Sequence, residues 1–322
     1  MCMVSICVPI YGVEQYIERC AESLFEQTYN DIEYLFINDC TKDNSMVLLN
    51  KVILRYPNRE KNIRIINHDR NLGLSGARIT AIKESRGEFI SWVDSDDYIE
   101  KDMIEKLVSL AYETKTDIIS CNTLIHYPQK VYKLVSPKFE TSQKAILAML
   151  NRQAPVSVWA RLIRRSLYIE HEIYPMIGIN NGEDLQVMPR LAYYGKLSHL
   201  DDCLYHYNCF NSNSYTYKYT RNKADDVWSS LMILESFFYN REPILLRAVK
   251  QLMVKTIIKD IVNSCREGYV DYFIKARSRM NGVEQDIRKT LPFLYKVVWW
   301  LNSYNFVRYS TKFVDFFKHK NK

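Results

Sequence analysis

Residues 88–103, EFISWVDSDDYIEKDM, decide how the rest of the chain is interpreted. An apolar run, residues 89–93, is followed at once by three carboxylates, Asp94, Asp96 and Asp97. Such a run is typical of a buried strand, and an unpaired carboxylate beside buried residues is costly. Because carboxylates this close repel one another, the stretch predicts that a positive charge lies next to them.

Two explanations fit the three carboxylates. A divalent cation would relieve their repulsion, since Mg²⁺ or Mn²⁺ is usually held by one or two carboxylates together with substrate phosphates and water. Alternatively, Asp96 and Asp97 could cap a helix predicted over residues 101–115, because Asp accepts hydrogen bonds from free N–H groups at helix starts. Capping leaves Asp94 unexplained, so the pattern favours a site for metal and phosphate.

The segments around this stretch alternate between apolar runs and helical patterns. Strands are predicted at residues 4–9, 32–38, 62–67 and 88–94, and helices at residues 13–24, 44–56, 75–86 and 101–115. This order predicts an α/β nucleotide-binding sandwich with a central, mostly parallel sheet. Ligands of such sheets bind beyond the carboxyl ends of the strands, where Pro9, Asp39 and Asp94 fall.

The pattern changes towards the C-terminus. Two further strands are predicted at residues 117–125 and 130–135, and the chain becomes helical throughout from about residue 221. We therefore predict a first domain over residues 1–220, made of a nucleotide-sugar half (1–115) and an acceptor half (116–220). A helical region over residues 221–322 follows it.

Composition limits the class of protein. The 322 residues carry a formal net charge of +7, and no motif of a nucleic-acid reader is present, so nucleic acid is disfavoured as a partner. The eight cysteines form no C-x-x-C pair, which is typical of reduced thiols in a cytoplasmic protein. Neither a signal peptide nor a membrane-spanning run is predicted.

The C-terminal segment, residues 292–322, interleaves aromatic and basic side chains. This pattern is typical of a helix that lies in a membrane interface, and it would place the protein at the inner face of the membrane. An ordinary packing helix or a homodimer contact would carry the same pattern. The sequence leaves these alternatives open.

Four segments resemble a known family in order and spacing. They are VSICVPIYGVEQYIERCAESLFEQTY, FINDCTKDNS, NLGLSGAR and GEFISWVDSDDYI. Together they resemble the donor-binding half of the family 2 inverting glycosyltransferases of the GT-A fold. The resemblance covers roughly residues 4–215.

The resemblance implies how a nucleotide-sugar donor, UDP-linked, would be bound. Pro9, Tyr11 and Glu14 match the loop that contacts the uridine, and Asp39 matches the acidic residue that recognises the uracil. The segment that borders the nucleotide, N-x-G-x-x-x-A-R, corresponds to Asn71, Gly73, Ala77 and Arg78. Four positions depart from the family's usual residues and put the donor's identity in question, namely Gly12, Asn38, Cys40 and Ile79.

The resemblance also assigns Asp94-Ser95-Asp96 to the family's D-x-D. The first Asp would lie by the ribose or sugar, and Asp96 would hold Mn²⁺ or Mg²⁺ on the diphosphate. Asp97 would support them or cap a helix.

An inverting transfer needs a base for the acceptor hydroxyl, and the second half of the chain offers one. Glu183 and Asp184 begin an amphipathic helix, where carboxylates are also favoured by the helix dipole alone. The resemblance implies that this pair is the acceptor-side motif, with Asp184 as the base and Glu183 beside it. His206 and the basic residues Arg161, Arg164 and Arg165 could approach phosphate groups, although structural or solvated roles are common for such residues.

These patterns predict a metal-dependent inverting glycosyltransferase that acts on a glycan or lipid-linked acceptor in polysaccharide biosynthesis. One alternative is a nucleotidyltransferase that makes a sugar nucleotide, but residues 8–16 lack the Gly-rich, basic phosphate loop of that class. Another is a non-catalytic partner of the same fold that binds glycan or another protein. Loss of the D-x-D or of the Glu-Asp pair would favour the non-catalytic alternative, but both motifs are present.

Overall fold

A computed structural model describes residues 3–210, 219–282, 287, 304 and 307. The chain folds as two compact units, Met1–Tyr217 and Lys218–Lys322. Residues 292–322, for which membrane contact is predicted, lie outside the described residues apart from Tyr304 and Val307.

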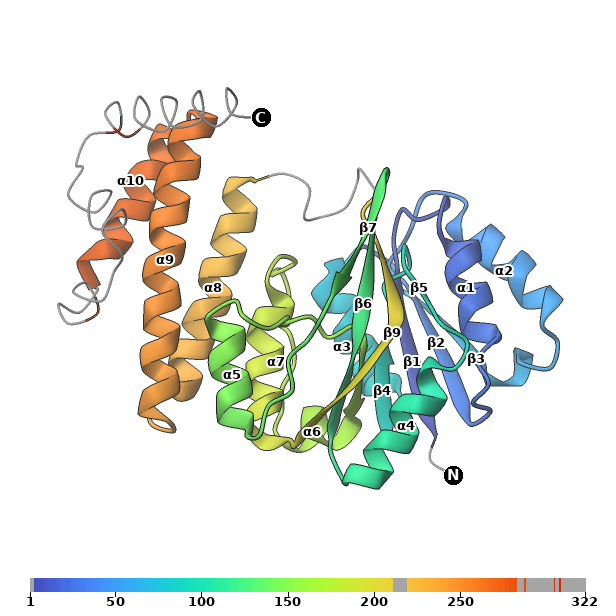
Figure 1. Ribbon diagram of the computed structural model, residues 1–322. Coiled ribbons are helices and arrows are strands. Elements are labelled where there is room, and N and C mark those ends of the chain that lie inside the picture. Colours follow the sequence, from blue (N-terminus) through green and yellow to red (C-terminus); the bar gives the residue numbers. More distant parts are fainter. Residues whose placement is uncertain (1–2, 211–218, 283–286, 288–303, 305–306, 308–322) are drawn as a thin grey trace. The chain divides into compact units, whose positions relative to one another are not determined.

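A nine-stranded sheet forms the centre of the first unit, as far as the described residues show (Figure 1). Its order is β3-β2-β1-β4-β8-β6-β9-β5, and β7 pairs with β6. The strands are β1 (Val4–Ile10), β2 (Ile32–Asn38), β3 (Ile63–Asn67), β4 (Phe89–Trp92), β5 (Tyr98–Ile99), β6 (Ile118–Tyr127), β7 (Lys130–Leu134), β8 (Arg161–Arg164) and β9 (Leu197–Asn208).

The first four strands pair in parallel, and every residue of β1 is buried. The predicted α/β class and the parallel strands of the first half are therefore confirmed. Beyond β4 the sheet becomes mixed, because β8 runs antiparallel to both β4 and β6 while β9 runs parallel to β6.

Helices of the first unit connect the strands and cover the sheet. They are α1 (Ile17–Phe25), α2 (Ser45–Arg55), α3 (Gly73–Glu84), α4 (Met103–Thr114), α5 (Ser142–Leu150), α6 (Arg165–Glu170) and α7 (Glu183–Tyr194). The helix predicted from residue 13 begins at Ile17, because the chain first makes a turn in which Tyr16 N–H donates to Val13 O. Ile17, Cys20 and Leu24 are buried in the core beside β2, as their helical spacing predicts.

The second unit is helical. It contains α8 (Arg221–Phe238), α9 (Pro243–Glu267) and α10 (Val270–Ser278). Its core includes Ile257, Ile261 and Phe273, and Val307 packs into it with 1% of its surface exposed. No helix in the described ranges has the length and apolar content needed to cross a membrane.

Candidate active site

A cavity of about 550 Å³ lies at the carboxyl ends of β1 and β4, entirely within the first unit. The parallel register aligns Cys7 with Trp92 and Ile10 with Asn38, so the loops after β1, β2 and β4 meet at one edge of the sheet. Twelve of the predicted site residues line the cavity: Pro9, Tyr11, Asp39, Asn71, Gly73, Ala77, Arg78, Asp94, Ser95, Asp96, Glu183 and Asp184.

Glu14 is the predicted site residue that is not among those lining the cavity. Its carboxylate Oε2 accepts hydrogen bonds from the backbone N–H and the side-chain Nδ2 of Asn44, at 2.9 and 3.0 Å. Asn44 immediately precedes α2, so Glu14 connects the loop after β1 to the start of that helix. The structure thus gives Glu14 a role in shaping the loop, and its contact with the uridine stays a prediction.

Asp39 is buried and organises the loop before α3. Leu72 N–H and Gly73 N–H donate to its Oδ1 and Oδ2, each at 2.8 Å, and His68 Nδ1 lies 2.7 Å from Oδ1. Oδ1 therefore has two partners and Oδ2 has one, which leaves Oδ2 with capacity for a further donor. Cys40, where the resembled family usually has Gly, adopts a left-handed backbone with φ of 59°.

The chain leaves the sheet after Trp92 and places the three aspartates in different surroundings. Asp94 and Asp96 are partly exposed and line the cavity, whereas Asp97 is buried. Tyr205 OH and Asn208 N–H donate to Asp97, each at 2.7 Å. Burial raises the pKa of the Asp97 carboxyl, and the charges of Asp96 and Asp94 add to this effect.

The capping explanation for these aspartates is wrong. Helix α4 begins at Met103, two residues later than predicted, and Asp102 occupies the capping position. Asp97 instead joins the loop after β4 to β9, because both of its hydrogen-bond partners come from that strand.

Arg78 supplies the positive charge that the carboxylates require. Its guanidinium is buried, and Nη1 donates to Glu183 Oε1 at 2.9 Å and also to Asp184 Oδ1. Nη2 lies 3.4 Å from Asp94 Oδ1. Although burial alone would lower the pKa of Arg78, the charges of Asp184, Glu183 and Asp94 raise it. One guanidinium thus joins carboxylates from both halves of the unit.

Glu183 and Asp184 form the first turn of α7, which follows Gly182 in a left-handed conformation with φ of 90°. Asp184 Oδ2 accepts from Val158 N–H at 3.3 Å, a long hydrogen bond. The Asp184 side chain is 17% exposed and that of Glu183 is 9% exposed. Burial raises the pKa of the Glu183 carboxyl to about 8, and the neighbouring Asp184 charge adds to this while Arg78 opposes it.

The segment before α7 is fixed against the start of α3. Ser75 N–H donates to Asn180 Oδ1 at 3.3 Å, and the Ser75 hydroxyl donates to Ile179 O. Gly73 has a φ of 75°, and a Cβ added there would lie 2.4 Å from Asn180 Oδ1. A larger residue at position 73 would therefore displace the Asn180 side chain, and its backbone would be strained at this φ.

Two aromatic side chains that line the cavity, Trp159 and Tyr207, were not predicted from the sequence. Trp159 stacks on both Tyr205 and Tyr207, with its ring centroid 5.0 and 5.1 Å from theirs and nearly parallel planes. Trp159 and Tyr207 line the cavity. The available signal was the Trp in SVWARLIRR, which precedes β8. The sequence alone does not distinguish this Trp from an ordinary core aromatic residue, because it does not show that β8 and β9 lie in one sheet.

The other candidate residues lie away from the cavity. His206 stacks on Tyr98 at 4.1 Å, and its Nε2 lies 2.8 Å from Glu100 Oε1, which supports the structural interpretation. Arg161 and Arg164 belong to strand β8. Arg164 pairs with Glu88 and Asp117, and none of the three arginines 161, 164 and 165 is among the residues lining this cavity.

The carboxylates that line the cavity fit a metal site in which substrate phosphates supply some of the ligands. Among the described side chains, no group of three or more His, Cys, Asp or Glu is arranged to bind a metal ion. Asp94 and Asp96, however, line the cavity two positions apart, and one or two carboxylates suffice for Mg²⁺ or Mn²⁺ when phosphates supply the remaining ligands.

Comparison with known proteins identifies the family. The family model described as "Glycosyl transferase family 2" matches residues 5–171, just over half of the chain. The chain belongs to this family. A curated relative, "Uncharacterized glycosyltransferase EpsJ" of Bacillus subtilis (strain 168), is 36% identical over 176 residues, which are 52% of this chain and 49% of the relative. The chain thus matches about half the length of that relative.

Solved structures share the fold of this family 2 chain. S. aureus TarS 1-349, in complex with UDP-GlcNAc, has a TM-score of 0.75 at 18% identity, over 96% of this chain and 91% of that one. Mannosyltransferase PcManGT from Pyrobaculum calidifontis, in complex with GDP-Man and Mn²⁺, has a TM-score of 0.58 at 13% identity, over 98% and 88%. The predicted family and GT-A fold are confirmed.

Proposed function

We propose that this chain is a metal-dependent inverting glycosyltransferase that moves a sugar from a UDP-sugar to a hydroxyl group of a glycan or lipid-linked oligosaccharide. The observation that carries the proposal is the arrangement around Arg78. Donor-side Asp94 and acceptor-side Glu183 and Asp184 meet at one guanidinium beside a cavity of about 550 Å³. Solved structures of the same fold hold a nucleotide sugar.

Donor binding is assigned to the loops after β1, β2 and β4. Oδ2 of Asp39 has the capacity to accept the imide N–H of uracil, while Pro9, Tyr11 and Asn71 border the base and ribose. Asp94 and Ser95 lie where the ribose and sugar would be placed, and Asp96 would hold Mn²⁺ or Mg²⁺. When bound, the metal ion would neutralise charge on the departing diphosphate.

Asp184 is assigned as the general base. In a single displacement at the anomeric carbon, the acceptor oxygen forms the new bond as the bond to UDP breaks, and the hydroxyl proton passes to a carboxylate. Arg78 holds Asp184 through Oδ1, and the long bond from Val158 leaves Oδ2 available to the proton. Glu183 is more deeply buried, and its raised pKa of about 8 favours the protonated form at neutral pH.

An aromatic surface for the acceptor follows from the same geometry. Trp159 and Tyr207 present stacked rings to the cavity, and such rings pack well against the apolar face of a sugar. Because Val158 N–H holds Asp184, Trp159 lies next in sequence to a contact of the proposed base.

Product analysis tests the proposal. The full chain is incubated with Mn²⁺, a panel of UDP-sugars and either glycan acceptors or water alone. A transferase releases free UDP, and faster with its acceptor present, whereas a nucleotidyltransferase would release pyrophosphate from UTP and a sugar phosphate. Release of neither product, with nucleotide sugars failing to raise the thermal unfolding midpoint, would contradict the proposal.

A further inference from the structure

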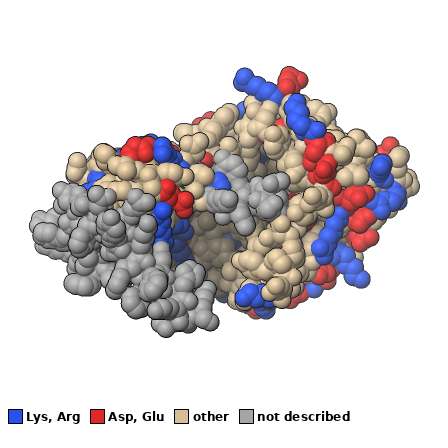
Figure 2. All heavy atoms as spheres, turned by 90° about the horizontal axis from the view of Figure 1, so that it is seen from above, with Lys and Arg blue, Asp and Glu red and all other residues tan. Residues whose placement is uncertain are grey.

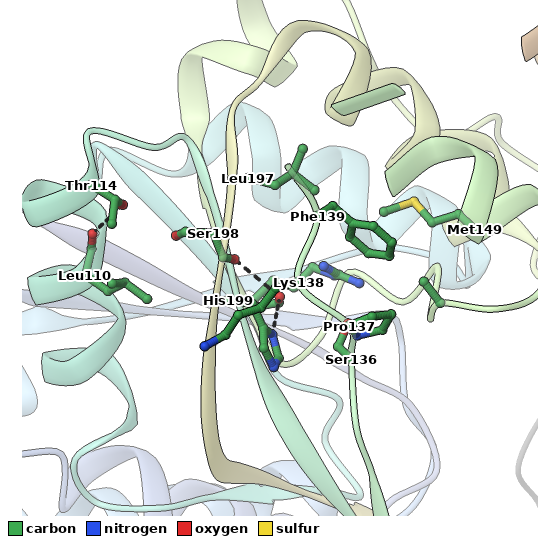
Figure 3. Close-up of a pocket in the computed structure, with 13 residues that line it drawn as sticks. Leu110, Thr114, Ser136, Pro137, Lys138, Phe139, Met149, Leu197, Ser198 and His199 are labelled. Atoms are coloured by element: carbon green, nitrogen blue, oxygen red, sulfur yellow. Dashed lines mark hydrogen bonds between the residues drawn. The ribbon is translucent and has the colours of Figure 1, made fainter. Parts of the chain in front are cut away.

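A second cavity of about 250 Å³ lies in the first unit, apart from the donor cavity (Figure 3). It is formed where α4 ends and β9 begins, beside β6, β8 and the segment before α5. None of the residues that line it lines the donor cavity. Its volume is below the ~300–1,000 Å³ of sites for drug-sized ligands, so it suits a smaller molecule.

The charge of this second cavity is opposite to that of the donor cavity. Arg161 and Lys138 line it, and no Asp or Glu is among its described lining residues. The donor cavity is lined by five carboxylates and one arginine: Asp39, Asp94, Asp96, Glu183, Asp184 and Arg78. The second cavity therefore favours an anion.

Arg161 is the central cation. Only 4% of its surface is exposed, and its Nε and Nη2 donate to the backbone carbonyls of Ser157 and Pro155, at 2.7 and 2.9 Å. Within the part of the chain that the structure describes, no carboxylate forms an ion pair with it and Nη1 has no hydrogen-bond partner. Burial lowers the pKa of Arg161 to about 10, so the side chain remains charged at neutral pH. The charge of Asp184 opposes this effect on the pKa, but it acts from beyond ion-pair distance. A buried cation with no counter-charge in direct contact is costly unless a ligand supplies one.

Arg190 provides an internal comparison. Its Nε and Nη2 also donate to backbone carbonyls, those of Gln186 and Tyr174, and burial lowers its pKa to about 10 as well. Arg190, however, is not among the residues that line either cavity. An unpaired arginine is thus not by itself a site, and what distinguishes Arg161 is the open volume beside it.

Hydroxyl and imidazole groups surround this volume. His199 Nε2 faces Asn122 Oδ1 at 3.1 Å and its Nδ1 faces Ser120 Oγ at 2.8 Å, so both ring nitrogens are occupied. Burial lowers the pKa of His199, which favours the neutral ring. The Ser136 hydroxyl lines the cavity and makes no hydrogen bond to the described residues. Lys138 lies at the exposed rim, where it pairs with Asp201 at 2.7 Å.

Apolar side chains form the remaining wall. Leu110, Phe139, Met149 and Leu197 line the cavity together with Pro137 and Ala154 (Figure 3). An inorganic anion would leave this wall without contacts, and an uncharged apolar molecule would leave the guanidinium without a counter-charge.

We propose that this cavity is a binding site for a small organic anion, in which a carboxylate or phosphate group pairs with Arg161 and an apolar body packs against Phe139, Met149 and Leu197. Carboxylate and phosphate share the chemistry that a guanidinium recognises, through charge-assisted N–H···O hydrogen bonds. The site shares no lining residue with the donor cavity. Arg161 nevertheless holds the carbonyls of Ser157 and Pro155, close in sequence to Val158, which contacts the proposed base.

Calorimetric titration of the full chain tests the site with four probes. Hexanoate and hexyl phosphate carry both features, hexan-1-ol lacks the charge, and inorganic phosphate lacks the apolar body. We expect one saturable site for hexanoate, hexyl phosphate or both, and binding at least tenfold weaker for the other two probes. The stronger of the two six-carbon anions tells which headgroup the site prefers. Binding of neither would overturn the proposal.

Three variants locate the binding. Arg161→Met is expected to weaken it roughly 10- to 100-fold, the equivalent of one lost hydrogen bond to a charged group. Ala154→Leu fills the cavity while keeping the guanidinium, and it should abolish binding even if Arg161→Met does not fold. Arg190→Met is the matched control and should bind as the wild type does. Unchanged binding in Ala154→Leu, or equal loss in Arg190→Met, would show that the anion binds elsewhere.

Discussion

Arg78 Nη1 lies 2.9 Å from Glu183 Oε1, although the two residues are 105 positions apart in the chain. The guanidinium comes from α3, in the half that carries the donor motifs, and the carboxylate comes from the first turn of α7. This hydrogen bond, with Asp94 and Asp184 also contacting the guanidinium, fixes the acceptor side of the cavity against the donor side.

Replacing Arg78 should destabilise the first unit. Arg78→Met leaves up to three carboxylates near one another without their cation, and breaking a buried pair typically costs about 3–5 kcal/mol. Chemical denaturation measures this loss. Arg55→Met is the control of equal charge change, because Arg55 and Glu22 form an exposed pair and should contribute less than about 1 kcal/mol. Equal stability of Arg78→Met and the wild type would contradict the structural role.

Glu183 should make stability depend on pH. Its pKa is raised from 4.5 to about 8, so the folded protein binds this proton more tightly than the unfolded chain does. The resulting stabilisation is complete below about pH 4.5 and is lost as the pH rises through about 8. The thermal midpoint of metal-free, donor-free Glu183→Gln should therefore fall less over this range than that of the wild type.

The exposed Glu140 offers a control for this pH series. Its side chain is 81% exposed in a pair with Lys144, so Glu140→Gln should follow the wild-type curve between pH 4.5 and 8. Parallel curves for Glu183→Gln and the wild type would mean that the Glu183 proton does not distinguish the folded from the unfolded state.

Asp96 and Asp39 should affect UDP binding in different ways. We expect Asp96→Ala to remove the part of UDP affinity that requires Mn²⁺ and to leave the fold intact, since the residue is partly exposed. Asp39→Asn should weaken UDP binding with and without Mn²⁺. It should also lower stability, because the amide has a single acceptor oxygen and either Leu72 N–H or Gly73 N–H loses its partner. Titrations of UDP with and without the metal separate the two effects.

A carboxylate from the helical unit serves as the reference for these titrations. Asp271 is 66% exposed and pairs with Arg221, so Asp271→Ala should bind UDP as the wild type does. If Asp96→Ala kept the full Mn²⁺-dependent affinity, the metal would be held elsewhere.

Membrane contact through residues 292–322 remains a prediction that charge reversal can test. Deletion of the segment would also remove Val307, which is buried in the core of the helical unit. Replacing Lys312, Lys318 and Lys320 by Glu leaves Val307 in place and should reduce binding to vesicles that contain phosphatidylserine, since each such residue contributes about 1 kcal/mol near an anionic surface. Uncharged phosphatidylcholine vesicles provide the baseline. Unchanged binding to the anionic vesicles would exclude an electrostatic membrane contact.

Charges of both signs lie on the described part of one face of the molecule. On the face seen in Figure 2, Lys and Arg are interspersed with Asp and Glu over the described residues.

The parallel half of the sheet could be predicted because its signals are local. Apolar runs bounded by helical patterns mark β1 to β4, and parallel pairing then requires that the loops after Pro9, Asp39 and Asp94 share one edge. The second half depends on long-range pairing. Nothing local indicates that β8 should run antiparallel between β4 and β6, or that it should bring Trp159 to the cavity.

The hydrogen-bond partners of individual side chains could not be predicted from the sequence either. Sequence patterns predict that Arg78 and Glu14 lie near the donor. In the structure, the Arg78 side chain contacts the first turn of α7, and the Glu14 side chain contacts the residue that precedes α2. Both contacts join residues that are more than twenty positions apart in the chain, so they depend on how the chain folds. The metal ion expected beside Asp94 therefore stays a prediction, whereas the contact of Arg78 with Asp94 emerged only from the fold.

The assignment of Asp184 as the base is the central claim, and transfer by Asp184→Asn tests it most directly. The Asn side chain keeps the size and can still accept from Arg78, but it cannot take up a proton. We expect transfer to fall by about 10² to 10⁴, the usual contribution of general-base catalysis, while UDP affinity stays near the wild-type value. Glu183→Gln, measured alongside, should retain more activity. If only Glu183→Gln stops transfer, or if Asp184→Asn loses UDP binding together with turnover, Asp184 is not the base.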